Sequence, residues 1–413
     1  MKRPERDEDQ PSPASAKKGK DAAGLRVALF SGNYNYIRDG ANNALNHLGR
    51  FLLDRGAAVR VYSPTLPHPA FAPAGDVVSI PSIPIPGRGE YRLGLGLGRH
   101  AREDIRRFAP TVFHLSAPDR LGHRAQAFAR DLGVPVVASL HTRFESYLGY
   151  YGLGFARSLV ERVERRFYRG CDLVLVPNLA MAEVLARWGL SGKVRLWSRG
   201  VDHAQFAPEH RSLPWRRAHG YTDDEIVLLF FGRLVREKGL DVFADVVGAL
   251  RARGHRIRPL VVGTGPERGH LSQRLGKAVF TGHLEGARLA RAIASADIML
   301  NPSVTEAFGN VDLEAMASGL ALVSTDVPYA LTLLDERSGA LVPPGDPAGY
   351  VAAVERLILH PAERAALAEA ALHRSTAFGW PQTLAAVLSA YRELGAVPGV
   401  PGRPRAAARS EAA

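Results

Sequence analysis

The sequence has 413 residues, a length that fits two domains better than one, and its 46% hydrophobic and 23% charged residues are an ordinary globular composition. A single cysteine excludes an intramolecular disulfide and favours a reducing compartment, and no apolar run approaches the roughly 18–20 residues that span a bilayer. The net charge of +12 suits nucleic acid, an anionic membrane surface or phosphorylated ligands, without choosing among them.

The two ends of the chain predict segments outside the fold. Residues 1–24 mix both signs of charge with Pro, Ser and Ala and lack the apolar stretch of a secretory signal, so we expect a disordered leader. Residues 396–413 have a similar composition, and we expect a disordered tail there. Because no secretory signal is found, we expect a cytoplasmic protein.

Twelve short apolar runs alternate with helical patterns along the rest of the chain. They are residues 25–32, 57–64, 111–118, 134–142, 171–178, 193–200, 225–233, 258–265, 277–283, 297–303, 320–326 and 339–345. Most are apolar without strict alternation, which is typical of parallel strands buried on both faces. Strand and helix alternating in this way indicate right-handed crossovers and a doubly wound sheet.

The alternation occurs twice, with a proline-containing break that is poor in strand residues at 202–215. We therefore predict an α/β chain with two Rossmann-like domains, residues 25–204 and residues 205–375, facing a central cleft. A last helical pattern within residues 376–395 follows the second domain. In open α/β sheets ligands bind beyond the carboxyl ends of the strands, so the informative residues should follow the apolar runs.

Two strand exits in the second half carry phosphate-binding chemistry. One run ends at Gly232 and is followed by Arg233 and Lys238, and two cations beside a glycine suit a diphosphate. A solvent-exposed basic loop is the alternative. Another run ends in a glycine turn at Gly263, whose amides can approach a ligand.

The stretch "VTEAFGNVDLEAMASG", residues 304–319, has two glutamates that bracket seven residues. Glu306 precedes a helix start and Glu314 falls in the predicted first turn, so both carboxylates can accept hydrogen bonds from hydroxyl groups. Glu306 suits a sugar and Glu314 suits the vicinal hydroxyls of a ribose. The alternative is that Glu314 only complements the helix dipole and Glu306 is a surface residue.

The helix start between these glutamates predicts an anion site. The amides of Gly309, Asn310 and Val311 have no helical partner, and the helix dipole favours a negative charge there. In the first half, Gly40 also precedes a helix, and His141 lies at a strand exit where it can face the cleft. A structural histidine is the alternative for His141.

Taken together, these motifs resemble family 4 of the retaining glycosyltransferases, which have the GT-B fold. The resemblance rests on "FFGRLVREKG", "VVGTGPER", "TEAFGNVDLEAMASG" and "LVPPGD", with "DGANNAL", "SLHTRF" and "SRGVD" in the first half. It covers about residues 25 to 395 and is strongest from 226 to 346. It implies two Rossmann-like domains and a last helix, with Trp380, that packs back on the first domain.

The resemblance also implies the role of each residue. Arg233 and Lys238 would bind the donor diphosphate, Glu306 would contact the donor sugar, and Glu314 would contact the ribose. The backbone around these residues would line the pocket, and this lining comprises Gly232, Gly263, Phe308, Gly309, Asn310 and Val311. Gly40 would approach the diphosphate from the other domain, and His141 would lie beside the transferred sugar.

Two departures from the family pattern fall on this pocket. Relatives often have two glycines where this chain has Asp39 and Gly40, which makes phosphate contact from that loop less certain. Many relatives carry a glycine turn where this chain has "VPYA" at residues 327–330, and this change is expected to reshape one wall.

The implied reaction moves a hexose from a nucleotide-sugar with retention, and needs neither a metal ion nor another cofactor. GDP-mannose is the leading donor and a UDP-hexose is the alternative. A non-catalytic sugar-nucleotide-binding protein of the same fold is the alternative from another class.

The acceptor is expected to meet the first domain. Residues 88–107 carry six arginines against three acidic residues and residues 157–169 carry five against two, so each is net +3. Apolar and aromatic residues at 144–155 lie between these segments in the sequence. A lipid or glycan acceptor at an anionic membrane, contacted peripherally from its inner face, would fit, and a solvated basic surface is the alternative. No basic stretch interleaved with stacking aromatics is found, so nucleic acid is not expected as a partner.

Overall fold

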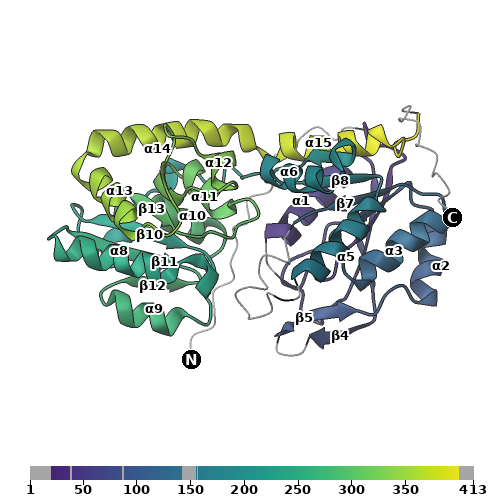
Figure 1. Ribbon diagram of the computed structural model, residues 1–413, viewed down its shortest axis with the longest axis horizontal. Coiled ribbons are helices and arrows are strands. Elements are labelled where there is room, and N and C mark those ends of the chain that lie inside the picture. Colours follow the sequence, from purple (N-terminus) through teal and green to yellow (C-terminus); the bar gives the residue numbers. More distant parts are fainter. Residues whose placement is uncertain (1–19, 38–39, 86–87, 142–154, 156, 400–413) are drawn as a thin grey trace, which may run out of the picture.

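The computed structural model describes residues 20–37, 40–85, 88–141, 155 and 157–399. These residues form two α/β halves that lie side by side, with the first half on the right of Figure 1 and the second on the left. Each half is built around its own parallel sheet.

The sheet of the first half has seven strands in the order β3-β2-β1-β6-β7-β8-β9, all parallel. Its strands are β1 (Arg26–Phe30), β2 (Ala58–Ser63), β3 (Asp76–Ser79), β6 (Val112–Leu115), β7 (Val136–Ser139), β8 (Leu173–Val176) and β9 (Val194–Leu196). Four of the inner strands, β1, β6, β7 and β8, are almost entirely buried because helices cover both faces of the sheet.

The sheet of the second half has six strands in the order β12-β11-β10-β13-β14-β15, again all parallel. Its strands are β10 (Ile226–Phe231), β11 (Ile257–Val262), β12 (Val279–Gly282), β13 (Ile298–Asn301), β14 (Ala321–Thr325) and β15 (Ala340–Val342). All twelve predicted strands are thus present, and the doubly wound α/β architecture in two halves is confirmed.

Three further strands were not predicted. The edge strand β3 is only partly buried, and β4 (Ser82–Ile85) pairs antiparallel with β5 (Arg88–Gly94) in a separate two-stranded sheet. The sequence of β4 and β5 contains proline, glycine and arginine in place of a continuous apolar run. The pattern of a strand buried on both faces therefore could not identify them.

Helices connect the strands of both sheets and cover their faces. In the first half they are α1 (Gly40–Asp54), α2 (Arg99–Phe108), α3 (Arg120–Asp131), α5 (Arg157–Arg169) and α6 (Leu179–Arg187). In the second half and beyond they are α7 (Leu213–Ala218), α8 (Leu240–Ala252), α9 (Arg268–Leu275), α10 (Gly286–Ala294), α11 (Asn310–Ala317), α12 (Ala330–Leu333), α13 (Pro347–Leu359), α14 (Pro361–Ser375) and α15 (Trp380–Glu393).

The last helix, α15, crosses back to the first half, as Figure 1 shows at the top of the molecule. Its residues Leu384, Val387 and Leu388 belong to the same buried cluster as Leu29 of β1 and Leu48 of α1. The cluster also contains three residues from the expected leader and tail, Ala22, Ala396 and Val397. The domain boundaries near residues 204 and 375 stay predictions.

The order of the strands shows where each of the two sheets has its topological switch point. In the first sheet the order reverses between β1 and β6, and in the second between β10 and β13. Crevices form at such points beyond the carboxyl ends of the strands, because the adjoining crossovers lead to opposite faces of the sheet. The chain segments that follow these four strands are therefore placed to form a binding site.

Candidate active site in the cleft between the two halves

A cleft of about 1000 Å³ lies between the halves and is lined by residues from both. Segments that follow β1, β6, β7 and β9 line one side, and segments that follow β10, β11 and β13 line the other. Every site residue expected from the sequence lies on its wall: Gly40, His141, Gly232, Arg233, Lys238, Gly263, Glu306, Phe308, Gly309, Asn310, Val311 and Glu314.

An ion pair connects two of these residues in the second half. The ammonium group of Lys238, at the end of a short 3-10 helix (Arg236–Lys238) after β10, donates to the carboxylate of Glu306. Both side chains are largely buried, with relative exposures of 20% and 18%. Arg233, in contrast, is exposed on the wall of the cleft and has no ion-pair partner among the described residues. Its guanidinium is available to an anion.

Glycine lets two strand exits approach each other at Gly232 and Gly263. Gly263 has a φ of +138° and donates its amide to the carbonyl of Gly282 at 2.9 Å. A Cβ atom at Gly263 would collide with the carbonyl oxygen of Gly232, so a side chain is excluded there. The exits of β10 and β11 therefore present bare backbone to the cleft.

The helix start predicted between the two glutamates is present. Gly309, in the left-handed region with a φ of +91°, precedes α11, and no side chain caps the helix. The first amides of the helix therefore remain available to a ligand in the cleft. Because α11 begins at Asn310, Glu314 is its fifth residue and lies in the second turn, one turn later than expected.

Glu314 lines the cleft from α11, and its carboxyl group receives no hydrogen bond from the described residues. Burial raises the pKa of this carboxyl group to about 8. A carboxyl group that is partly buried in the wall and has no hydrogen-bond partner is suited to accept hydrogen bonds from two neighbouring hydroxyl groups of a ligand.

Asp312, also on α11, was missed by the sequence analysis. Its side chain is fully buried, accepts a hydrogen bond from the amide of Asn301 at 2.8 Å, and lies near Glu306 and Lys238. Burial raises the pKa of Asp312 to about 7, and Glu306 adds to this effect while Asn301 opposes it. The feature of the sequence that could have identified Asp312 is an acidic residue in the first turn of the helix. The burial of this residue was not evident from the motif.

The "VPYA" segment, residues 327–330, lies behind the part of the cleft wall that precedes α11. Tyr329 is buried and donates its hydroxyl to the carbonyl of Ser303 at 2.8 Å, and a Cβ atom placed at Gly309 would lie 3.1 Å from its ring. The segment 327–330 does not itself line the cleft. The departure from the family pattern therefore lies behind the turn before α11 and does not line the cleft.

On the opposite wall, His141 follows β7 and is only 8% exposed. A nitrogen of Arg199 lies 2.6 Å from Nδ1 of its ring, and the ring of Trp197 meets it edge-on at 5.5 Å between centroids. Burial, helped by the nearby Arg199 cation, lowers the pKa of His141 well below its usual range, so the imidazole is neutral. Arg199 lies within the quoted "SRGVD" motif but was not singled out.

A second buried histidine, His114 of β6, does not line the cleft. Its two ring nitrogens lie 2.5 Å from the hydroxyl of Tyr391 on α15 and 2.5 Å from the hydroxyl of Ser139 on β7. Burial lowers the pKa of His114 to about 3. Both ring nitrogens are satisfied within the core, so this histidine has a structural role.

Described residues of the two halves approach each other across the cleft. The side-chain amide of Asn178 donates to the carbonyl of Ala307 at 2.8 Å. Gly40 lies so close to the side chain of Asn310 that a Cβ atom there would collide with it. Gly40 thus reaches the helix start of the other half. Asp39, the departure from the family pattern on this loop, lies outside the described residues.

The described residues contain no group of three or more His, Cys, Asp or Glu side chains that could hold a metal ion. Within the same part of the chain, each helix is too short or too polar to cross a membrane.

The chain matches two family models. One, described as glycosyl transferases group 1, matches residues 225–360, and the other, described as glycosyltransferase family 4, matches residues 38–205. A sulfoquinovosyl transferase of Arabidopsis thaliana is 31% identical over 86% of this chain and 71% of its own length. A GDP-mannose-dependent alpha-mannosyltransferase of Mycolicibacterium smegmatis is 32% identical over 86% of this chain and 94% of its own.

Solved structures share the fold at lower identity. A sucrose-phosphate synthase of Thermosynechococcus elongatus superposes with a TM-score of 0.72 at 22% identity, covering 90% of this chain and 99% of that one. A protein of Anabaena in complex with UDP superposes with a TM-score of 0.69 at 18% identity, covering 88% of this chain and 98% of that one. The chain therefore belongs to family 4 of the glycosyltransferases and is a glycosyltransferase with two Rossmann-like domains in the GT-B arrangement.

Proposed function

We propose that this enzyme transfers a hexose, with retention, from a nucleotide-sugar to a lipid or glycan acceptor, and that GDP-mannose is its donor. The observation that carries the proposal is the convergence, in one cleft, of two cations, an uncapped helix start and two carboxyl groups. Each type of group matches a different part of a nucleotide-sugar. The enzyme would act in the cytoplasm, at the inner face of the membrane.

In the proposed complex the diphosphate lies between the cations and the helix start. Arg233 and Lys238 face it with positive charge, and the amides of Asn310 and Val311 donate hydrogen bonds. Glu314, without a hydrogen-bond donor among the described residues, accepts the hydroxyl groups of the ribose. Glu306, held by Lys238, contacts the sugar.

The proposed transfer forms a bond between the acceptor oxygen and the anomeric carbon while the bond from that carbon to the phosphate oxygen breaks. The nucleoside diphosphate leaves with the bonding electrons, and its departing oxygen takes the proton of the acceptor hydroxyl. Lys238, Arg233 and the amides at the start of α11 stabilise the charge that grows on the phosphate. The two glutamates do not serve as an acid and nucleophile pair in this scheme.

The choice of mannose rests on similarity. GDP-mannose-dependent alpha-mannosyltransferases of Mycobacterium tuberculosis and Mycolicibacterium smegmatis are 31% and 32% identical to this chain. A UDP-hexose is the second candidate, because a structural neighbour was solved in complex with UDP.

Thermal shifts with GDP, UDP, ADP and their sugar conjugates test the donor. A ligand that binds the folded state raises its unfolding free energy by RT ln(1 + [L]/Kd). A shift with GDP and GDP-mannose alone supports the proposal, and a shift with UDP compounds alone replaces mannose by the second candidate. Release of GDP from GDP-mannose on addition of a lipid acceptor then separates turnover from binding.

The acceptor is proposed to lie in an anionic membrane that the first half touches. The α5 helix exposes Leu159 and Val163, one helical turn apart, beside Arg162 and Arg166.

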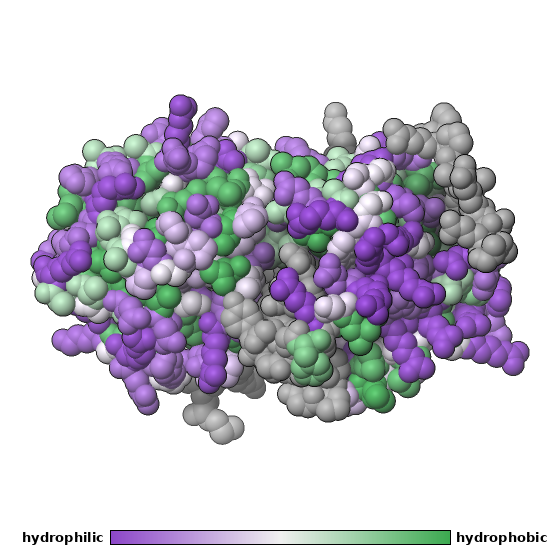
Figure 2. Space-filling model, viewed as in Figure 1, coloured by the Kyte–Doolittle hydropathy of each residue, from purple (hydrophilic) through white to green (hydrophobic). Residues whose placement is uncertain are grey.

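Figure 2 shows hydrophilic residues over this half and hydrophobic residues at the β4–β5 hairpin. The side chains of Ile83, Leu93 and Leu95 are exposed there. Apolar side chains next to arginines suit a surface of anionic lipid. Of the expected aromatic segment 144–155, only Phe155 is described, and it is 85% exposed.

Co-sedimentation with vesicles tests this contact. We expect binding to vesicles that contain phosphatidylglycerol and little binding to phosphatidylcholine alone, because exposed arginines are attracted to the anionic surface. The double substitution Arg162→Glu/Arg166→Glu should abolish most of the binding. The same charge change on the second half, Arg291→Glu/Arg337→Glu, is the matched control. Equal loss in both variants would show that only net charge matters and would contradict a docking face on α5.

A further inference from the structure

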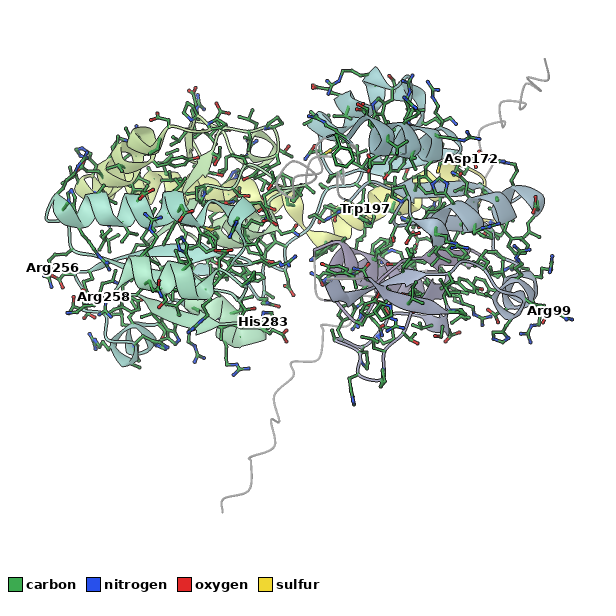
Figure 3. All side chains as sticks on the ribbon, turned by 60° about the horizontal axis from the view of Figure 1, so that its bottom comes forward. Arg99, Asp172, Trp197, Arg256, Arg258 and His283 are labelled. Atoms are coloured by element: carbon green, nitrogen blue, oxygen red, sulfur yellow. The ribbon has the colours of Figure 1, made fainter. Side chains whose placement is uncertain are left out.

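A buried arginine lies on the wall of the cleft, three residues after the end of β9. Arg199 is only 4% exposed, and its side chain bridges two residues of the first half. One guanidinium nitrogen lies 2.6 Å from Nδ1 of His141, and the other lies 3.5 Å from the carbonyl oxygen of Trp197. The guanidinium carbon is 5.2 Å from the centroid of the Trp197 ring. Figure 3 places Trp197 close to the junction between the two halves.

The direction of the hydrogen bond between Arg199 and His141 follows from the chemistry of the two groups. A guanidinium group has five N–H donors and no acceptor, so Nδ1 of His141 must accept. A neutral imidazole carries a single N–H hydrogen. In this protein that hydrogen must therefore reside on Nε2.

The Nε2 atom of His141 is buried and has no hydrogen-bond partner among the described residues. A buried N–H group without a partner is unfavourable, and in native structures such groups are usually satisfied by protein, water or ligand. Since His141 lines the cleft, a ligand oxygen that enters beside the ring can supply the missing acceptor.

This arrangement is the reverse of a histidine that acts as a base. In such a site a carboxylate or carbonyl accepts from the N–H at Nδ1, which leaves a free electron pair on Nε2. Here a donor occupies Nδ1, and Nε2 can only donate. Burial and the Arg199 cation also lower the pKa of His141, which disfavours a second proton on the ring.

We infer that Arg199 is a positioning residue that holds His141 in the tautomer with its hydrogen on Nε2, so that His141 donates a hydrogen bond to an oxygen of the bound donor substrate and removes no proton. The identity of that substrate as a nucleotide-sugar rests on the function proposed above. The tautomer itself is a property of the free protein.

The tautomer is measured first, by nitrogen-15 NMR of the ligand-free protein labelled at histidine. The signals of His141 are assigned by their loss in His141→Asn. We expect a directly bonded hydrogen on Nε2 and none on Nδ1, and Arg199→Met should convert this pattern to a mixture of the two tautomers. A hydrogen on Nδ1 in the unsubstituted protein would overturn the inference.

Kinetic measurements then distinguish an effect of Arg199 on the orientation of His141 from an effect of its charge on the ligand. Arg199→Met removes the donor and should lower kcat by about two- to tenfold, because only the fraction of the protein with the hydrogen on Nε2 of His141 can still donate to the substrate. Arg199→Gln keeps an N–H donor without the charge and should recover most of the rate, with Kd for the bare nucleotide unchanged in both variants. If Arg199→Gln is as slow as Arg199→Met and binds nucleotide more weakly, Arg199 acts by its charge on the ligand and the inference fails.

Two controls keep the outcomes distinct. Arg216, another buried arginine, pairs with Asp297 at 2.9 Å and does not line the cleft. Arg216→Gln should lower the unfolding temperature but leave the His141 tautomer unchanged. If no nucleotide produces a thermal shift, the proposed donor is wrong, while the tautomer of the free protein still confirms or contradicts the role of Arg199.

Discussion

The two walls of the cleft hold their polar groups in different ways. The wall of the second half carries charge: the Lys238–Glu306 ion pair, the exposed Arg233 and an uncapped helix start. The wall of the first half carries a neutral imidazole that a buried arginine orients. In the proposed reaction, one wall would attract and stabilise a charged leaving group, and the other would orient a neutral sugar.

Removing a cation from the charged wall should have the largest effect. Lys238→Met is expected to lower kcat by about 100- to 1000-fold, because a preorganised charge on the leaving phosphate is lost and Glu306 is left without its partner. Steady-state rates of transfer measure the effect. Lys277→Met removes an exposed lysine of the same half as a control and should leave the rate within twofold of wild type. A comparable rate in Lys238→Met would show that the charged wall does not act on the leaving group.

Substitution of the two glutamates of that wall should have different effects on the Kd for the bare nucleotide. Glu314→Ala should raise the Kd for nucleoside diphosphate by about 10- to 100-fold, the loss of hydrogen bonds to a charged acceptor. Glu306→Ala frees Lys238, so the same Kd should stay constant or fall while transfer is impaired. Calorimetric titration with the bare nucleotide gives both values. Equal weakening by both substitutions would refute this division of roles.

The pH dependence of nucleotide binding should report the ionisation of the Glu314 carboxyl group. Its pKa is raised to about 8 in the free protein, so the carboxyl group is mostly protonated at pH 7. Ribose hydroxyls favour the ionised form, so binding should release a proton and the affinity should rise about tenfold from pH 7 to pH 9. Titrations in buffers of different ionisation enthalpy measure the proton release. Glu314→Gln should bind weakly with no pH dependence over this range, and a wild-type affinity that falls with pH would contradict the assignment.

The smallest effect on the reaction is expected in the core of the first half, at His114, which does not line the cleft. Tyr391→Phe removes the hydroxyl beside Nδ1 of the fully buried His114 and should destabilise the fold by about 1–3 kcal/mol, with kcat unchanged at 25 °C. Urea unfolding measures the loss. Tyr221→Phe, whose hydroxyl makes a longer bond of 3.4 Å in the second half, is the matched control and should cost less. An unchanged midpoint in Tyr391→Phe would show that the bond contributes nothing.

The same contrast explains what could be predicted from the sequence. Buried parallel strands require continuous apolar runs, so all twelve were found, and the charged wall lies within local strand-loop-helix motifs such as residues 298–317. The neutral wall and the core of the first half depend on distant pairs: His141 and Arg199 of the wall are 58 residues apart, and His114 and Tyr391 of the core are 277 apart. No local pattern encodes such contacts, and the burial of Asp312 also depends on the complete fold. The functional roles of the site residues stay predictions.

The return of α15 has a consequence for the order in which the protein acquires its structure. Leu384, Val387 and Tyr391 of this helix share a core with Leu25 and Val27 at the start of the first sheet. During translation the first half emerges from the ribosome long before α15 does, and until then one face of its core is exposed to water. The first half is therefore expected to finish folding only after nearly the whole chain has been made, and a nascent chain stalled before α15 should depend on chaperones.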